Sequence, residues 1–190
     1  MGIINKLKIN SMRRKKSFTL IEMIVVIATI GLVLPTLFAI IFSILQQQLK
    51  IQRLSIVKKE GDYVLNVMEN VIRNYAVKIY SEHNFINERC ATENSTYGPN
   101  FFFRDKYDRW FNFYQSYNNI SSNSANLSSP VNLNSSQTRI TNFSIQCYKT
   151  ALYSPPVINI SFTISYYTSS SRAEETASFN YQTKVKLKSY

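Results

Sequence analysis

The chain has 190 residues, with 22 Lys and Arg against 11 Asp and Glu, one His, two Cys and 45% hydrophobic residues. This length allows one or two domains, such as one membrane span followed by one modest domain. A single imidazole and two thiols make Cys/His zinc sites and histidine-dependent nucleophiles improbable. The chain has only four Gly, and we find no nucleophile elbow and no phosphate-binding glycine loop. We therefore expect no enzymatic activity, no cofactor and no metal site.

The positive charge is concentrated at the start of the chain. The net charge is +11, and residues 1–17 contain six basic side chains and no acidic one. The 23 residues from Met23 to Leu45 then carry no formal charge, which is enough to cross a hydrocarbon core of about 30 Å. The apolar region of a cleaved secretory signal is shorter, at about 7–15 residues. Because the basic side chains before a span stay in the cytoplasm, we predict a single-pass protein with its N-terminus inside and its C-terminus outside.

A carboxylate, Glu22, stands at the head of this apolar run. The string KKSFTLIEMIVVIATIG combines a basic leader, a small residue at Ser17, Phe18, and Glu22 as the fifth residue counted from Phe18. In residues and in order, it resembles the N-terminal cleavage and methylation motif of type IV prepilins and type II secretion pseudopilins. The resemblance covers residues 13–45.

The resemblance implies how the N-terminus is processed. In that family, a membrane aspartyl peptidase facing the cytoplasm cuts after the small residue and then methylates the new amine. The cut would here fall between Ser17 and Phe18, so that residues 1–17 are a removed leader, residues 18–45 are the transmembrane helix and Phe18 is methylated. The family's usual residue before the cut is Gly, so Ser17 is a departure, although it is also small.

Glu22 is the candidate assembly residue. Cleavage creates a positive amine at Phe18. An unpaired amine or carboxylate is energetically unfavourable in lipid. Pairing Glu22 of one subunit with the amine of Phe18 on its neighbour satisfies both charges and sets the register of a helical filament. Gly31 and Pro35 are candidates for a helix kink or a locally melted stretch, because Pro removes a backbone donor and disfavours helix just before it.

Residues 46–80 are predicted to form an amphipathic helix. Apolar residues recur at three- and four-residue steps, which is typical of one helix face packed on a core; they are Leu54, Val57, Gly61, Val64, Met68, Val71, Ile72, Tyr75 and Ile79. The Gly61-Asp62 pair interrupts this face and is a candidate bend. Through Met68, Glu69 and Arg73, the stretch also resembles the segment after the span in J-type minor pseudopilins and related minor pilins.

Residues 81–190 are predicted to form an exported, β-rich domain. Two-residue alternation predicts strands around residues 143–147, 158–166 and 179–187. An antiparallel sheet with one solvent-exposed face must bury its apolar face against another element, and the apolar face of the helix is available for this. We therefore expect an α+β fold, in which a long N-terminal helix packs on an antiparallel β-sheet as in pilins. Residues 116–136 contain 8 Ser and 6 Asn and are expected to be an exposed loop or a disordered insertion.

Two features of this domain have more than one interpretation. Residues 101–117 hold nine aromatic side chains interleaved with Arg104, Lys106 and Arg109. They either fill the small core or a subunit contact, or form a stacking platform for single-stranded nucleic acid. Cys90 and Cys147 would lie outside the cytoplasmic membrane, where a disulfide can persist. They form either that disulfide or two unpaired buried thiols.

These observations favour a structural subunit. We expect a minor subunit of a type IV pilus or type II secretion pseudopilus, located in the inner membrane and then in the pilus or pseudopilus outside it. Its expected partners are the prepilin peptidase, other pilin or pseudopilin subunits, the inner-membrane assembly platform and the lipid bilayer. The alternatives are a tip-located minor pilin that binds DNA or a surface, and an unprocessed single-span protein. Secretion, competence, adhesion and motility machines all remain open.

Overall fold

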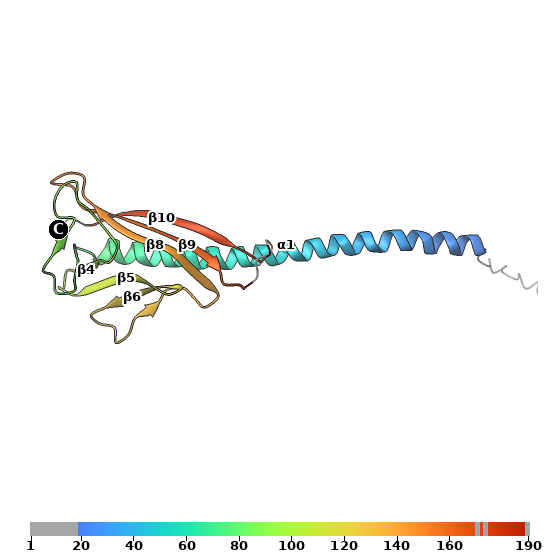
Figure 1. Cartoon of the computed structure of the whole chain (residues 1–190), viewed down its shortest axis with the longest axis horizontal. Helices are drawn as coiled ribbons and strands as arrows, with labels where there is room; N and C mark the ends of the chain where they lie inside the picture. The colour runs from blue at the N-terminus through green and yellow to red at the C-terminus, as the bar shows by residue number, and fades with distance from the viewer. Residues whose placement is uncertain (1–18, 170–171, 173–174, 189–190) are drawn as a thin grey trace, which may run out of the picture. The chain divides into compact units, whose positions relative to one another are not determined.

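The computed structural model describes residues 19–169, 172 and 175–188 (Figure 1). The described residues form one α-helix and ten β-strands, and the fold class is α+β, as predicted. The chain divides into two compact units, residues 1–45 and residues 46–190, which are described separately below. The elements are α1 (Leu20–Tyr75), β1 (Lys78–Tyr80), β2 (Glu88–Arg89), β3 (Thr96–Tyr97), β4 (Phe102–Arg104), β5 (Trp110–Ser116), β6 (Asn119–Ser124), β7 (Val131–Asn132), β8 (Thr138–Tyr148), β9 (Val157–Tyr166) and β10 (Ser178–Lys186).

In the first unit, the helix is continuous through Gly31 and Pro35, so the local melting suggested by the sequence is not present. Pro35 offers no N–H to the carbonyl four residues earlier, and its ring would crowd that carbonyl. The carbonyl concerned is that of Gly31. A Cβ built at Gly31 would meet no atom within 4 Å outside its own stretch of helix, so space is open beside this residue. A kink at these residues stays a prediction.

Two hydroxyls inside the apolar run bond back to the helix itself. Thr29 Oγ1 donates to the Val26 carbonyl at 2.9 Å, and Thr36 Oγ1 donates to the Val33 carbonyl at 2.8 Å. In a bilayer, no water is available to satisfy such groups, so they must be satisfied within the helix. The two hydroxyls are therefore compatible with a lipid environment.

The second unit contains two antiparallel sheets. One has six strands in the order β2-β1-β4-β5-β6-β7, and the other has four in the order β10-β9-β8-β3. The three strands expected from two-residue alternation are β8, β9 and β10, which pair in sequence order. A β-bulge interrupts β8 between Thr141 and Ser144, where Asn142 takes a positive φ of 54°. Asn tolerates this conformation better than most residues.

The core of the second unit joins the helix to both sheets. The buried helical residues Val57, Gly61, Val64, Met68 and Ile72 follow the predicted apolar face. Apart from Gly61, they belong to one cluster with the inward side chains of the strands, including Phe103 and Phe113 from the six-stranded sheet and Ile145, Ile160, Phe162 and Ile164 from the four-stranded sheet. In Figure 1, β5 and β6 lie below this part of the helix and β10 lies above it, whereas β8 crosses it in the view.

The prediction that the helix reaches residue 80 is wrong. The helix ends at Tyr75, and residues 78–80 form β1. Val77 N donates to the Arg104 carbonyl at 2.8 Å, and Ile79 then lies opposite Phe103 in an antiparallel ladder. Ile79 continues the apolar spacing of the helix, but the same side chain is equally well buried from a strand. Pairing with β4, which is distant in sequence, decided the conformation.

The prediction that residues 116–136 are a loop or a disordered insertion is also wrong. They contain β6, which pairs with β5, and β7, which pairs with β6. Ile120 is fully buried, and the buried Asn134 replaces missing backbone partners. Its Oδ1 accepts from Ile120 N at 3.0 Å, and its Nδ2 donates to Asn119 Oδ1 at 2.9 Å and to the Thr138 carbonyl at 3.2 Å. Hydrogen bonds stabilise a stretch that has little apolar surface.

Cys90 and Cys147 form a disulfide, with Cα atoms 6.2 Å apart. Both residues are fully buried. Cys147 lies on β8 opposite Tyr97 of β3, and Cys90 directly follows β2. The disulfide therefore links Cys90, just after the edge strand β2 of the six-stranded sheet, to β8, an inner strand of the four-stranded sheet.

We expect Cys90 and Cys147 to be unreactive toward maleimide in the protein isolated from cells, because they form a disulfide. Because both sulfurs are bonded to each other, maleimide should label neither Cys in the unreduced protein, even after unfolding in denaturant. Reduction before unfolding should allow labelling of both residues and change the mobility on a non-reducing gel. Double labelling of unreduced, unfolded protein would contradict the disulfide.

Candidate functional site

The start of the helix has a reciprocal capping arrangement. Thr19 precedes the first helical residue, and Glu22 is the third residue of the helix. Thr19 N donates to Glu22 Oε2 at 2.8 Å, Thr19 Oγ1 donates to the same oxygen at 3.0 Å, and Glu22 N lies 3.4 Å from Thr19 Oγ1. This is a capping box, which satisfies backbone donors that the first helical turn leaves unpaired.

The capping box gives Glu22 a role within its own subunit. Ser17 and Phe18, the predicted cleavage and methylation residues, lie outside the described residues, so the pairing of Glu22 with a neighbouring amine stays a prediction. The carboxylate is exposed and retains lone pairs that Thr19 does not use. It can therefore cap its own helix and accept a second partner. The sequence signal for this role is the Thr19-x-x-Glu22 spacing, which none of the predictions above used.

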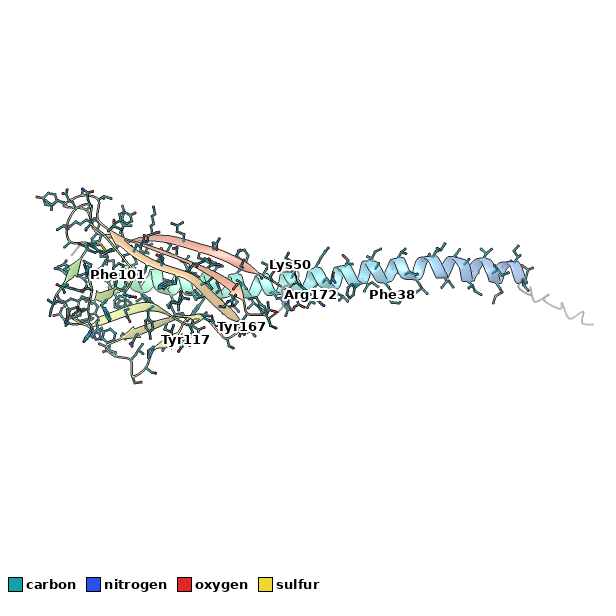
Figure 2. All side chains as sticks on the ribbon, in the orientation of Figure 1. Phe38, Lys50, Phe101, Tyr117, Tyr167 and Arg172 are labelled. Atoms are coloured by element: carbon teal, nitrogen blue, oxygen red, sulfur yellow. A yellow bond between two sulfur atoms is a disulfide. The ribbon has the colours of Figure 1, made fainter. Side chains whose placement is uncertain are left out.

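The apolar segment of α1 has no cover in the structure. Its most apolar stretch of 18 residues has a mean hydropathy of 2.8 and no buried residue, and Phe38 projects from the helix with 65% of its surface exposed (Figure 2). A soluble protein rarely exposes so large a contiguous apolar surface. The segment is long and apolar enough to span a membrane or to act as a signal sequence.

Gly61 lets a tyrosine from β10 approach the helix. A Cβ at residue 61 would lie 2.3 Å from Tyr181 Cε2. The Tyr181 hydroxyl lies 3.0 Å from the Lys58 carbonyl oxygen and 3.0 Å from Asp62 Oδ1, both acceptors. The Tyr181 ring stacks on Phe162 with ring centres 5.2 Å apart. The Gly61-Asp62 pair, predicted from the sequence as a candidate bend, is thus the point where Tyr181 of β10 packs against the helix.

Tyr181 should make the stability of the second unit depend on pH. Burial, and then the hydrogen bond and charge of Asp62, raise the pKa of Tyr181 from 10.0 to about 12. Because the unfolded chain releases this proton first, the contribution of Tyr181 is complete below pH 10 and is lost as the pH rises toward 12. Urea unfolding at pH 9 to 12 should therefore show a steeper loss of stability for wild type than for Tyr181→Phe. Parallel curves would contradict the prediction.

Glu60 ties the helix to the start of β8. Its carboxylate accepts from Ser135 N at 3.1 Å and also from the hydroxyls of Ser135 and Thr138. Such charge-assisted bonds are among the stronger hydrogen bonds in proteins. They position the connection between β7 and β8 against the helix, next to the buried Asn134.

The aromatic and basic residues of 101–117 divide between two faces. Phe101, Phe103, Phe111 and Phe113 are buried in the core, whereas Phe102, Trp110 and Tyr114 are half-buried. Because successive side chains of a strand point to opposite faces, the segment supplies both a core and an outer surface. The two interpretations of its aromatic residues are therefore not exclusive.

Two of the three basic residues of the same segment, Arg104 and Arg109, have acidic partners. Arg109 Nε lies 3.0 Å from Asp105 Oδ2, and Arg104 forms an ion pair with Asp108. Burial raises the pKa of Asp105, but bonds donated by Arg109 N and Tyr107 N and by the Arg109 side chain outweigh it, so that the pKa is lowered overall. These pairs shape the β4–β5 turn, and partnered guanidinium groups are poorer ligands for nucleic-acid phosphates.

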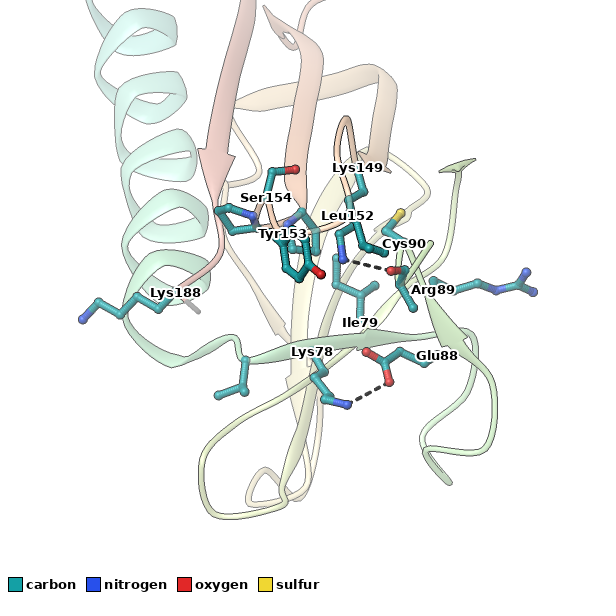
Figure 3. A pocket seen from close by; sticks show the side chains of 14 residues that line it. Lys78, Ile79, Glu88, Arg89, Cys90, Lys149, Leu152, Tyr153, Ser154 and Lys188 are labelled. Atoms are coloured by element: carbon teal, nitrogen blue, oxygen red, sulfur yellow. Dashed lines mark hydrogen bonds and ion pairs between the residues drawn. The ribbon is translucent and has the colours of Figure 1, made fainter. Parts of the chain in front are cut away.

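A second surface feature lies beside the disulfide. Figure 3 shows a pocket of about 280 Å³ between β1, β2 and the connection from β8 to β9. Lys78 Nζ donates to Glu88 Oε2 at 2.8 Å, which raises the pKa of Lys78, and Lys149 Nζ donates to the Ala91 carbonyl at 2.9 Å. Cys90 also lines the pocket, but its sulfur is bonded to Cys147, so it offers no free thiol nucleophile there.

Comparisons with protein-family models, curated proteins and solved structures find no significant match to this chain. The fold supplies the remaining information, since a long, uncovered apolar N-terminal helix continues as the core helix of a unit with antiparallel sheets. The architecture is pilin-like. A pilin-like architecture limits the function without specifying it, because one fold can serve many functions.

Proposed function

We propose that the protein is a minor structural subunit of a type IV pilus or type II secretion pseudopilus. It would be inserted in the inner membrane with its N-terminus inside, cleaved between Ser17 and Phe18, methylated on Phe18 and assembled through its N-terminal helix. The prepilin peptidase, other subunits and the assembly platform would be its partners. The proposal rests on one observation above all, the absence of any buried residue in the most apolar part of α1.

That observation favours a helix with two successive environments. An apolar surface of this length needs a cover, which lipid supplies in the membrane. In a filament, the same surface would be covered by the helices of other subunits, through an interface that repeats without closing. The capping box at Thr19 and Glu22 supports a helix that begins close to the predicted cut. The minor assignment rests on the resemblance around Met68, Glu69 and Arg73.

Processing provides the direct test of this proposal. Mass spectrometry of the protein extracted from membranes should find a chain that begins at Phe18 and carries one methyl group on its amine. Ser17→Leu should block the cut, because a bulky residue replaces the small one, but insertion should be unchanged because the apolar span is untouched. Ser11→Leu is a control within the same leader and should be cleaved normally.

A full-length N-terminus on the wild-type protein, in cells that contain an active prepilin peptidase, would contradict the proposal. That outcome would instead support an unprocessed single-span protein. Normal cleavage of Ser17→Leu would place the cut elsewhere in the chain.

A further inference from the structure

The outer face of the six-stranded sheet contains a groove of about 600 Å³ that the proposed function does not use. Side chains from β4, β5 and β6 and from two connecting segments line it, and they are of two kinds only. The first kind is aromatic, comprising His83, Phe102, Trp110 and Tyr114, and the second is amide, comprising Asn100, Asn112 and Asn123.

Three of the rings form a cluster. The ring centres of Phe102 and Trp110 are 5.7 Å apart with an edge-to-face arrangement. His83 lies 6.0 Å from Phe102 and 6.2 Å from Trp110. These contacts hold the half-buried Trp110 ring in place through neighbours on both β4 and the segment after β1. The groove therefore has a preformed aromatic wall.

The amides form the floor beside this wall. Asn112 of β5 and Asn123 of β6 are directly opposite each other in the antiparallel ladder, so their side chains share one face. The Asn112 Oδ1 atom is buried and has no hydrogen-bond partner among the described residues. A buried acceptor without a partner is costly, and such groups are rare in folded proteins. This oxygen is covered as the side chain stands, and a turn of the Asn112 amide toward the groove would let it accept a hydrogen bond from a ligand.

We propose that this groove binds a neutral saccharide. A pyranose ring has one apolar C–H face, which stacks on an aromatic ring, and a rim of hydroxyls, which donate to and accept from amide groups. Ligand sites commonly combine aromatic walls with a few polar groups that set orientation. None of the described lining residues is Asp, Glu, Lys or Arg, so nothing there favours a charged ligand.

Single-stranded nucleic acid fits this groove less well. Bases would also stack on Trp110, but the affinity of such sites depends on a positively charged path for the phosphates. Arg104 and Arg109, the nearest guanidinium groups in sequence, form ion pairs with Asp108 and Asp105. The saccharide proposal does not depend on whether the protein assembles into a filament, and it fails or holds separately from the proposed function.

Trp110 is the only Trp in the sequence, so its fluorescence reports this groove alone. The full-length protein, solubilised in a zwitterionic detergent that has no sugar headgroup, can be titrated with maltotriose, mannotriose, raffinose and chitotriose. We expect at least one of the four to change the emission of Trp110 saturably in the micromolar to millimolar range, with little dependence on salt. Oligothymidylate should cause no comparable change.

Two variants and a control sharpen the test. Asn112→Leu removes the unpaired acceptor and should weaken saccharide binding about tenfold or more, because a hydroxyl in the groove loses its partner. Tyr114→Ala should weaken it by removing part of the aromatic lining. Tyr117→Ala is the control, because Tyr117 is 93% exposed just beyond the same strand and does not line the groove (Figure 2). A cooperative urea unfolding transition, followed by Trp110 emission, verifies that each variant is folded.

The proposal is overturned if none of the four saccharides changes the emission at millimolar concentration. It is also overturned if the binding survives both groove variants unchanged, or if only oligothymidylate binds and does so with a steep loss of affinity in salt. The last outcome would assign the groove to nucleic acid.

Discussion

Glu22→Ala should be depleted from sheared filaments while its membrane pool stays normal. Insertion should not suffer, because the substitution removes a charge from the edge of an apolar segment. Assembly should suffer, because the amine of a neighbouring Phe18 would be left without a partner. Removing one member of a buried ion pair costs about 3–5 kcal/mol, which corresponds to a decrease of roughly two to three powers of ten or more in incorporation.

The capping box requires that two roles of Glu22 be separated. Glu22→Gln keeps a side chain that can complete the box, since Gln also serves at this position, but it has no charge. Thr19→Ala removes the capping hydroxyl, at a cost of about 1 kcal/mol, but leaves the carboxylate. If the charge pair matters, Glu22→Gln should be depleted as strongly as Glu22→Ala, and Thr19→Ala should assemble nearly normally.

The measurement compares the amount of each variant in the filament fraction with its amount in the membrane fraction. It is made after showing that each variant's leader is cleaved to the same extent as in wild type. The reverse pattern, with normal assembly of Glu22→Gln and depletion of Thr19→Ala, would show that Glu22 acts by capping its own helix. Normal assembly of a cleaved Glu22→Ala would remove both explanations.

Gly61→Ala should destabilise the second unit, although helix propensity alone predicts the opposite. Ala is favoured over Gly in a helix interior by about 1 kcal/mol. At residue 61, however, the new methyl group would lie 2.3 Å from Tyr181 Cε2. Displacing this ring would disturb its stacking on Phe162 and its hydroxyl contacts with Lys58 and Asp62. We expect a net loss of about 1–3 kcal/mol, as for other overpacked cores.

A double-mutant cycle identifies the cause of that loss. In a Tyr181→Ala background the ring is absent, so Gly61→Ala should become stabilising by about 1 kcal/mol through helix propensity. Urea unfolding of the full-length protein in detergent, followed by Trp110 emission, measures all four proteins. The explanation fails if Gly61→Ala changes the free energy of unfolding equally in both backgrounds.

Several elements could be predicted from the sequence because their signal is local. The apolar span, the helical face through Val57, Val64 and Met68, and the strands β8, β9 and β10 each follow from a repeated spacing of apolar residues. The capping box at Thr19 and Glu22 is also readable from a three-residue spacing, although it was overlooked. These features require only that neighbouring residues share a face.

Other elements depend on partners that are distant in the chain. Residues 78–80 became a strand because β4 pairs with them, and the Ser- and Asn-rich stretch became β6 and β7 because β5 and the Asn134 hydrogen bonds hold it. In neither case does local apolar periodicity reveal the partner. Backbone pairing can stabilise a polar segment that has too little apolar surface to order itself.

The sequence by itself determined the fold class, which is α+β with a long apolar N-terminal helix and antiparallel β-sheets. Only the tertiary structure decided what individual surface residues do. Phe102, Trp110 and Asn112 share the outer face because β4 and β5 pair antiparallel in one register, and Arg104 and Arg109 find carboxylates because the β4–β5 turn folds back on itself. A chain's composition cannot distinguish a free cation from a paired one, since pairing depends on geometry at the scale of a single hydrogen bond.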